Sequence, residues 1–207
     1  MKASYGSVNI DTQDLDKLLQ KLDASSQREI TVAALNKTII AVRDEAKQVI
    51  PEVYNIKKSD VKLTTTKAKT IAVNPFARIR ALYKPISLER FNAVQTPAGV
   101  SVQVIRSGGN KTISSAFIER PQGRDWKRYG QKKQVTSKKD LVLRAKNTKG
   151  FFRRYPLESL AGPSLGAMLT NEKVMKRVQL VIDNELPKNV YEAWEDNKNR
   201  FLPGDER

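Results

Sequence analysis

The sequence predicts an α+β fold in which a long helix packs on an antiparallel sheet, with a long basic arm and C-terminal helices. Three observations lead to this prediction. Apolar residues recur at helical spacing over residues 27–49, and they alternate with other side chains in short segments between residues 77 and 118. Residues 121–150 show neither period. A helix and a sheet that each have one apolar face can cover each other.

The N-terminal part predicts a short strand at Val8–Ile10 and a short helix capped by Asp11. The next helix has a clear start signal, because Ser26 and Glu29 have the spacing of a capping box. Its predicted buried face consists of Ile30, Ala34, Leu35, Thr38, Ile39, Val42, Ala46 and Val49. We expect Pro51 to end this helix, since proline disfavours helical geometry in the preceding residue.

The middle of the chain predicts strands. One helical turn is expected near residues 57–61. Farther along the chain, Ala77, Ile79 and Ala81 alternate with Arg78, Arg80 and Leu82, which is typical of a strand. Val100, Val102 and Val104 repeat this alternating pattern. A turn at Gly108-Gly109-Asn110 leads towards a strand around residues 116–118. We expect the helix face that contains Leu35, Ile39, Val42 and Ala46 to pack against Ile79, Val102 and Phe117.

The C-terminal part predicts a return to the sheet at residues 151–152, followed by helices near residues 165–184 and 188–200. We therefore expect residues 1–120 and 151–185 to form one domain. The expected insertion in it is a basic arm, residues 121–150, and the expected C-terminal helical extension is residues 186–207.

The composition excludes several kinds of chemistry. The 207 residues contain no cysteine and no histidine, so disulfides, thiolate zinc sites and histidine-based proton transfer are impossible. Any bound metal would need oxygen ligands. No apolar run is long enough to span a bilayer, and Met1–Gly6 lack the apolar region of a secretory signal. We expect no export and no membrane partner.

Catalytic signals are weak. Gly109-Asn110-Lys111-Thr112 fails the pattern of a phosphate-binding loop, and a hairpin turn explains it better. Asp11, Asp14 and Asp16 suit a helix start, where the helix dipole favours acidic side chains, better than a metal site. Glu119 lacks a second carboxylate for nuclease chemistry. We therefore expect no enzymatic activity, no cofactor, no metal and no small-molecule substrate.

The net charge of +16 is concentrated in one region. Residues 120–154 contain 13 basic and 2 acidic side chains, whereas residues 155–207 have a net charge of −2. A basic segment of this kind can bind the phosphates of a nucleic acid, with aromatic side chains stacking on bases, or it can bind an acidic protein surface. The alternative is that the segment is flexible and solvated and binds neither. The candidate contact residues are Arg120, Arg124, Trp126, Lys127, Arg128, Lys132, Lys133, Lys138, Lys139, Arg144, Lys146 and Lys149.

Several short motifs occur in an order that resembles the minor tail protein Z family of phages. They are Ala34-Leu35-Asn36-Lys37-Thr38, Ile56–Lys62, Ala77–Ala81, Ile86–Phe91, Gly99–Val104, Ala116-Phe117-Ile118 and Tyr155–Ser164. The last is the most specific, and its motif residues are Pro156, Leu157, Leu160, Gly162, Pro163 and Ser164. For Gly162 and Pro163 we favour a structural role over direct partner contact, through a positive φ at Gly162 and the first turn of a helix at Pro163. The resemblance covers residues 28–178, and the basic stretch 121–150 departs from it.

The resemblance implies a structural virion protein that completes the head-proximal end of a phage tail and helps head–tail joining. It further implies a ring, with six-fold symmetry, around the DNA path. The expected partners are further copies of the chain, neighbouring tail or neck proteins and phage DNA through its phosphates. The expected location is the virion tail or neck, after assembly in the host cytoplasm. The alternative function is a free nucleic-acid-binding protein without sequence specificity.

Overall fold

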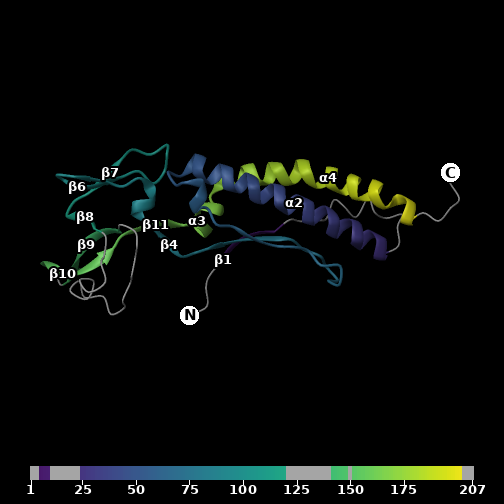
Figure 1. Ribbon diagram of the computed structural model, residues 1–207, viewed down its shortest axis with the longest axis horizontal. Helices are drawn as coiled ribbons and strands as arrows, with labels where there is room; N and C mark the ends of the chain where they lie inside the picture. Colours follow the sequence, from purple (N-terminus) through teal and green to yellow (C-terminus); the bar gives the residue numbers. More distant parts are fainter. Residues whose placement is uncertain (1–4, 10–23, 120–140, 149–150, 202–207) are drawn as a thin grey trace. The chain divides into compact units, whose positions relative to one another are not determined.

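The computed structural model describes residues 5–9, 24–119, 141–148 and 151–201 (Figure 1). It has long helices and small antiparallel sheets, which confirms the α+β class. The chain divides into two compact units. The first consists of Met1–Val49, Lys62–Tyr83 and Gly166–Arg207, and the second consists of Ile50–Val61 and Lys84–Leu165. This division differs from the single domain with an insertion and an extension that the sequence predicted.

The helix α2 spans Ala24–Val53. All eight residues of its predicted buried face are at most 2% exposed, so that prediction is confirmed. Both predicted ends are wrong. Ser26 lies inside the helix, and Pro51 does not end it, because Tyr54 N–H still donates to the Ile50 carbonyl oxygen at 2.8 Å. Proline removes only its own backbone donor, which the last turn of a helix tolerates better than its middle.

The helix α4 spans Glu172–Phe201 and follows the short helix α3, Leu165–Leu169. The sequence predicted a break before Lys188, and this prediction is wrong because α4 is continuous there. Leu186 and Val190 are buried on either side of Pro187, so one apolar face continues through the proline. This face comprises Val174, Val178, Ile182, Leu186, Val190 and Ala193. Among the described helices, none has the length and apolar character that a membrane span needs.

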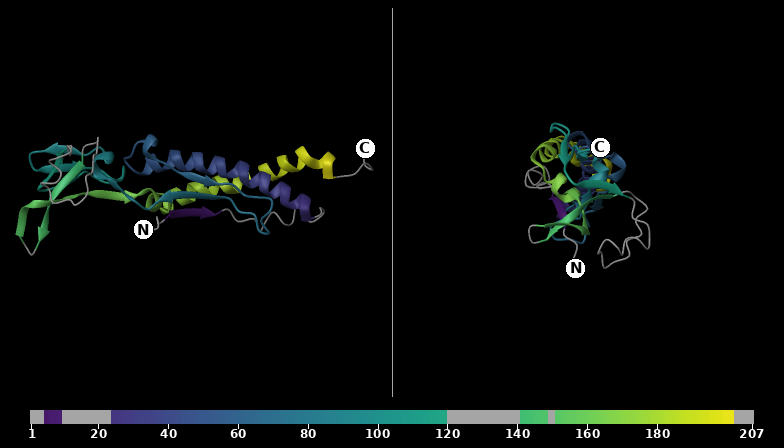
Figure 2. Two further views of the ribbon diagram at one scale, coloured as in Figure 1. Left: turned by 60° about the horizontal axis from the view of Figure 1, so that its bottom comes forward. Right: turned by 90° about the vertical axis from the view of Figure 1, so that its left-hand side faces the viewer.

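The sheet of the first unit has the strand order β1–β3–β2 and is antiparallel throughout. Its strands are β1 (Tyr5–Asn9), β2 (Thr64–Thr66) and β3 (Arg78–Leu82). Ile79 and Ala81 are buried and Arg80 and Leu82 are exposed, as the alternation predicted. In this unit α2 and α4 lie side by side, and the strands β2 and β3 run along α2 (Figures 1 and 2).

The described residues of the second unit form three small antiparallel sheets with the strand orders β5–β6–β7, β10–β9–β8 and β11–β4. Their strands are β4 (Pro85–Ser87), β5 (Val94–Thr96), β6 (Gly99–Val102), β7 (Lys111–Ile113), β8 (Ala116–Glu119), β9 (Leu141–Thr148), β10 (Phe151–Ser159) and β11 (Ala161–Ser164). Two 3-10 turns, η2 (Lys58–Asp60) and η3 (Leu88–Phe91), belong to the same unit.

This unit corrects two predictions. Residues 141–148 form β9, the central strand of its sheet, so this part of the predicted arm is wrong. Val102 and Phe117 lie in the second unit, whereas Leu35 and Ile79 lie in the first, so the residues expected in one core are divided between two units. The strand around residues 116–118 and the return at residues 151–152 are confirmed. The predicted helix after Asp11 falls outside the described residues.

Candidate functional site

The predicted basic contact residues are only partly described by the structure. Arg144 and Lys146 lie on β9, where Arg144 pairs with Ala116 of β8 and with Glu158 of β10. The remaining residues lie outside the described ranges; they are Arg120, Arg124, Trp126, Lys127, Arg128, Lys132, Lys133, Lys138, Lys139 and Lys149. Arg144 is therefore paired on both sides within the sheet, whereas Lys146 lies on β9 beyond the part that pairs with β8.

Two motif segments that lie far apart in the sequence meet in the second unit. The strands β4 and β11 pair, and Leu88 N–H donates to the Leu160 carbonyl oxygen at 3.3 Å. A Cβ atom at Gly162 would lie 2.8 Å from a ring carbon of Phe91. The segment Ile86–Phe91 and the end of the segment Tyr155–Ser164 therefore form one packed cluster, which we call the motif junction. Pro156 and Leu157 precede it on β10.

The motif junction corrects the roles predicted for Gly162 and Pro163. Among the described glycines only Gly99 has a positive φ, so Gly162 is needed for the close approach of Phe91 instead. Pro163 lies in β11, at the point where the pairing shifts between Gly162 and Ser164. A proline suits such a bulge because it has no N–H to donate to the ladder. Pro163 is therefore not in the first turn of a helix.

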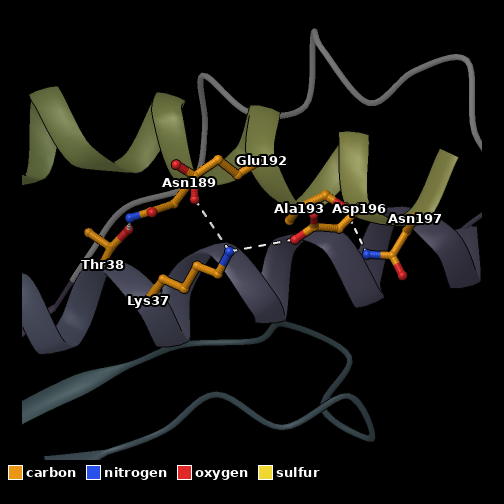
Figure 3. Close-up of polar contacts among 7 residues, drawn as sticks. All are labelled: Lys37, Thr38, Asn189, Glu192, Ala193, Asp196 and Asn197. Carbon is orange, nitrogen blue, oxygen red and sulfur yellow. Dashed lines mark hydrogen bonds and ion pairs between the residues drawn. The ribbon is translucent and has the colours of Figure 1, made fainter.

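Two residues of the motif in α2 make polar contacts across the first unit. Asn36 Oδ1 accepts a hydrogen bond from Ala68 N–H at 2.8 Å, and Asn36 Nδ2 donates to the Ala68 carbonyl oxygen at 3.2 Å. Asn189 Nδ2 on α4 donates to Thr38 Oγ1 at 2.9 Å (Figure 3). Both motif residues thus connect α2 to another element of the same unit.

The contacts between α2 and α4 differ in how much they contribute to the stability of the fold. Lys37 Nζ lies 3.3 Å from Glu192 Oε2 and 3.7 Å from Asp196 Oδ2, and all three side chains are about half exposed or more (Figure 3). Exposed ion pairs of this kind contribute little to stability. Thr38 and Asn189 are 0% and 8% exposed, so their hydrogen bond satisfies two groups that water does not reach.

We expect Asn189→Ala to lower the free energy of unfolding by about 1–3 kcal/mol, because it leaves the Thr38 hydroxyl without this partner. Chemical denaturation followed by circular dichroism measures the change. Asn184→Ala, at an exposed position of the same helix, is the matched control and should change it by less than about 0.5 kcal/mol. Equal effects of the two substitutions would contradict the importance of the buried hydrogen bond.

An apolar pocket of about 330 Å³ lies in the second unit, beside the loop that joins β6 and β7. Its lining residues are Leu88, Val102, Val104, Ile105, Gly108, Gly109, Lys111 and Ile113. The antiparallel pairing of β6 with β7 confirms that Gly109–Thr112 belongs to a hairpin. Lys111 is the only charged residue of this lining, and most of the other lining residues are aliphatic.

The structure also shows a surface that sequence reasoning missed. The loop between β2 and β3, residues 67–77, exposes Ile71 at 91% and Val73 at 83%. The signal in the sequence was a short apolar run beside Lys67 and Lys69, which resembles an ordinary strand. Within the described residues, no group of three or more acidic side chains is placed to hold a metal ion.

No family model matches this chain, and no curated protein or solved structure matches it.

Proposed function

We propose that this chain is a structural virion protein that completes the head-proximal end of a phage tail and helps to join the tail to the head. The observation that carries the proposal is the motif junction, where Ile86–Phe91 and Leu160–Ser164 pack together. These two segments are elements of the resemblance to the minor tail protein Z family. Their contact in space supports reading them as parts of one pattern.

The positions of the other motif residues support the same proposal. Ala77, Ile79 and Ala81 are buried, as are Ile56 and Val61, and Asn36 and Thr38 make the contacts described above. In the described part of the chain the motifs therefore supply packing and internal hydrogen bonds. Motif residues that stabilise the fold, and do not form a reactive site, are consistent with a structural role in an assembly.

The basic segment suggests how the protein would contribute at the junction of tail and head. With a net charge of +11, residues 120–154 suit the DNA path, where contacts with phosphates need no base sequence. The partners in this proposal are further copies of the chain, arranged as a ring with the six-fold symmetry of tails, and neighbouring tail or neck proteins. The protein would act in the virion tail or neck, after assembly in the host cytoplasm, and without catalysis.

The second candidate function is a free nucleic-acid-binding protein without sequence specificity. The concentration of charge in one segment favours it, because such a segment binds phosphates whether or not an assembly surrounds it. The two candidates differ in stoichiometry: a tail-completion protein adds a fixed number of copies to each tail, and a free binder adds copies in proportion to the length of nucleic acid.

Deletion of the gene from a phage that carries it tests the first candidate. We expect filled heads and separate, unjoined tails, with joining restored when the purified protein is added to the mixture. The protein should then co-sediment with tails that contain no DNA, in a constant ratio to the major tail protein. Normal virions from the deletion mutant would reject the proposal, as would binding that requires DNA.

A variant of the basic segment tests its role. Lys132, Lys133, Lys138 and Lys139 are replaced by glutamine, which removes four positive charges. If the segment contacts DNA phosphates, we expect the slope of log K against log salt to become shallower by about 3–4, together with defective head joining or DNA retention. If it docks on an acidic protein ring, binding to tails should fail while DNA affinity stays unchanged.

The matched control replaces Lys57, Lys58, Lys84 and Lys173, which are exposed and lie outside the basic segment, with glutamine. It makes the same change in net charge, so a general effect of charge would appear in both variants. Normal DNA binding, tail binding and head joining by the variant in the basic segment would contradict both roles.

A further inference from the structure

Two exposed surfaces of the first unit have opposite charge. The first is the β2–β3 loop, residues 67–77, in which Ile71 and Val73 are 91% and 83% exposed. Lys67 and Lys69 beside them are exposed as well. Residues 62–83 contain five basic and no acidic side chains. The loop thus presents two apolar side chains in a basic setting.

The β2–β3 loop is held at both ends. At its start, the two hydrogen bonds from Asn36 fix the backbone of Ala68 to α2. At its end, the guanidinium of Arg78 lies over the ring of Phe76, 5.1 Å from the ring centroid. A loop that is already positioned loses less conformational entropy when it binds a partner, so Ile71 and Val73 are well placed for contact.

The second surface is the outer side of α4 between Leu180 and Asp196. Leu180, Pro187 and Tyr191 recur there at helical spacing, and Leu180 and Tyr191 are 57% and 65% exposed. Residues 183–196 contain five acidic side chains and one basic side chain. We call this surface the acidic face of α4; it comprises Leu180, Asp183, Pro187, Tyr191, Glu192 and Asp196.

The acidic face keeps its negative charge despite its contact with α2. One lysine, Lys37, is shared by Glu192 and Asp196, whose side chains remain 60% and 70% exposed (Figure 3). Asp183 is also exposed, and it accepts a hydrogen bond from the uncharged Gln179. Lys188, which is exposed next to Pro187, pairs with Glu185 at 3.1 Å. The net charge around the apolar stripe therefore stays negative, which complements the β2–β3 loop.

These two surfaces do not meet within one copy of the chain. Inside the first unit, α2 lies between the C-terminal part of α4 and the strands that carry the β2–β3 loop (Figures 1 and 3). Ile71 and Tyr191 both remain largely exposed. Contact between the loop and the acidic face would thus need two molecules.

We propose that the β2–β3 loop of one copy docks on the acidic face of α4 of a second copy. Ile71 and Val73 pack against Leu180 and Tyr191, and Lys67 and Lys69 face the carboxylates beside them. Because the two surfaces differ, each copy can donate one loop and receive another. Such a heterologous contact closes into a ring or continues as a filament. The inference deepens the proposed function, which expects a ring, but its test needs no tails.

Cross-linking between single-cysteine variants tests the contact directly, since the natural chain contains no cysteine. Thr70→Cys places a thiol on the loop, and Asn184→Cys places one next to Asp183 of the acidic face; both positions are exposed. With a short bis-maleimide, we expect the mixture of the two variants to give about tenfold more dimer than Thr70→Cys with Lys173→Cys. Lys173 is exposed at the other end of α4. Equal yields would overturn the proposal.

Charge reversal in the same assay tests the complementarity. We expect Lys67→Glu/Lys69→Glu on the loop partner, or Asp183→Lys/Glu192→Lys on the face partner, to lower the yield about tenfold. Combining the two reversed partners should restore it, because opposite charges face each other again. If the single reversals lower the cross-linking yield but the combined reversals do not restore it, the proposal is overturned. The loop would then bind a different partner, such as another protein, a nucleic acid or a membrane. Circular dichroism of each variant confirms that it is folded.

The outcomes separate this inference from the proposed function. If the cross-link is specific but phage without the gene still makes normal virions, the proposed role in tails is rejected and the self-association is retained. A protein that tails need, but that gives no specific cross-link, would reject the self-association alone.

Discussion

Replacing Leu35 by aspartate should unfold the first unit or leave the protein insoluble. Leu35 is 0% exposed at the centre of the buried face of α2, between Ala34 and Thr38, which are also fully buried. A carboxylate there loses its hydration without gaining a partner, and the apolar contacts of leucine are lost as well. We expect the free energy of unfolding to fall by more than about 4 kcal/mol, a large share of the stability of a typical domain.

The matched control is Ile40→Asp on the same helix. Ile40 is 40% exposed, so water can hydrate the new carboxylate, and the free energy of unfolding should change by less than about 1 kcal/mol. The soluble yield and a denaturation curve measure both variants. Similar behaviour of Leu35→Asp and Ile40→Asp would show that the buried face of α2 is assigned incorrectly.

The second large effect is expected for Gly99→Ala in the second unit. Gly99 has a φ of +131°, which residues with a side chain rarely adopt. A Cβ atom there would lie 3.0 Å from the carbonyl carbon of Ile113 and closer still to its oxygen. Both atoms belong to the backbone of the adjacent strand region, so they cannot move aside as a flexible side chain could. We expect a loss of about 2–4 kcal/mol in the free energy of unfolding.

Gly109→Ala is the control for this substitution. Nothing lies within 4 Å of a Cβ atom at Gly109, so alanine has space there. Its effect should be within about 0.5 kcal/mol of zero, because no contact is disturbed. Thermal and chemical denaturation of the two variants measure the difference. Equal stability of Gly99→Ala and Gly109→Ala would contradict the backbone geometry described for β6.

The parts of the fold that the sequence predicted have strong periodic patterns. The buried face of α2 was correct at every position because eight residues repeat one helical spacing, and β3 was correct because Ile79 and Ala81 alternate with exposed side chains. By contrast, β7 has only three residues, Lys111–Ile113, which is too short to show an alternation. The strand β9 was also not predicted, because Arg144 and Lys146 made its sequence look like part of the basic segment.

Other features depend on contacts that no local pattern encodes. The sequence predicted two helices with a break between residues 184 and 188, but the buried face on both sides of Pro187 holds α4 together as one helix. The need for glycine at position 162 comes from Phe91, which is distant in the sequence, so the motif alone led to a wrong reason. The division into two units likewise depends on which distant segments pack together.

The buried hydrogen bond between Thr38 and Asn189 also determines how α2 and α4 are aligned. Apolar faces built from leucine, isoleucine and valine would tolerate a slip of one helical turn, about 5.4 Å, with much of their burial kept. After such a slip, Thr38 and Asn189 would each face an apolar side chain without a partner. The slipped alignment is therefore disfavoured, and the same polar pair fixes where Lys37 meets Glu192. One buried contact thus gives the helix pair a single alignment along its axis.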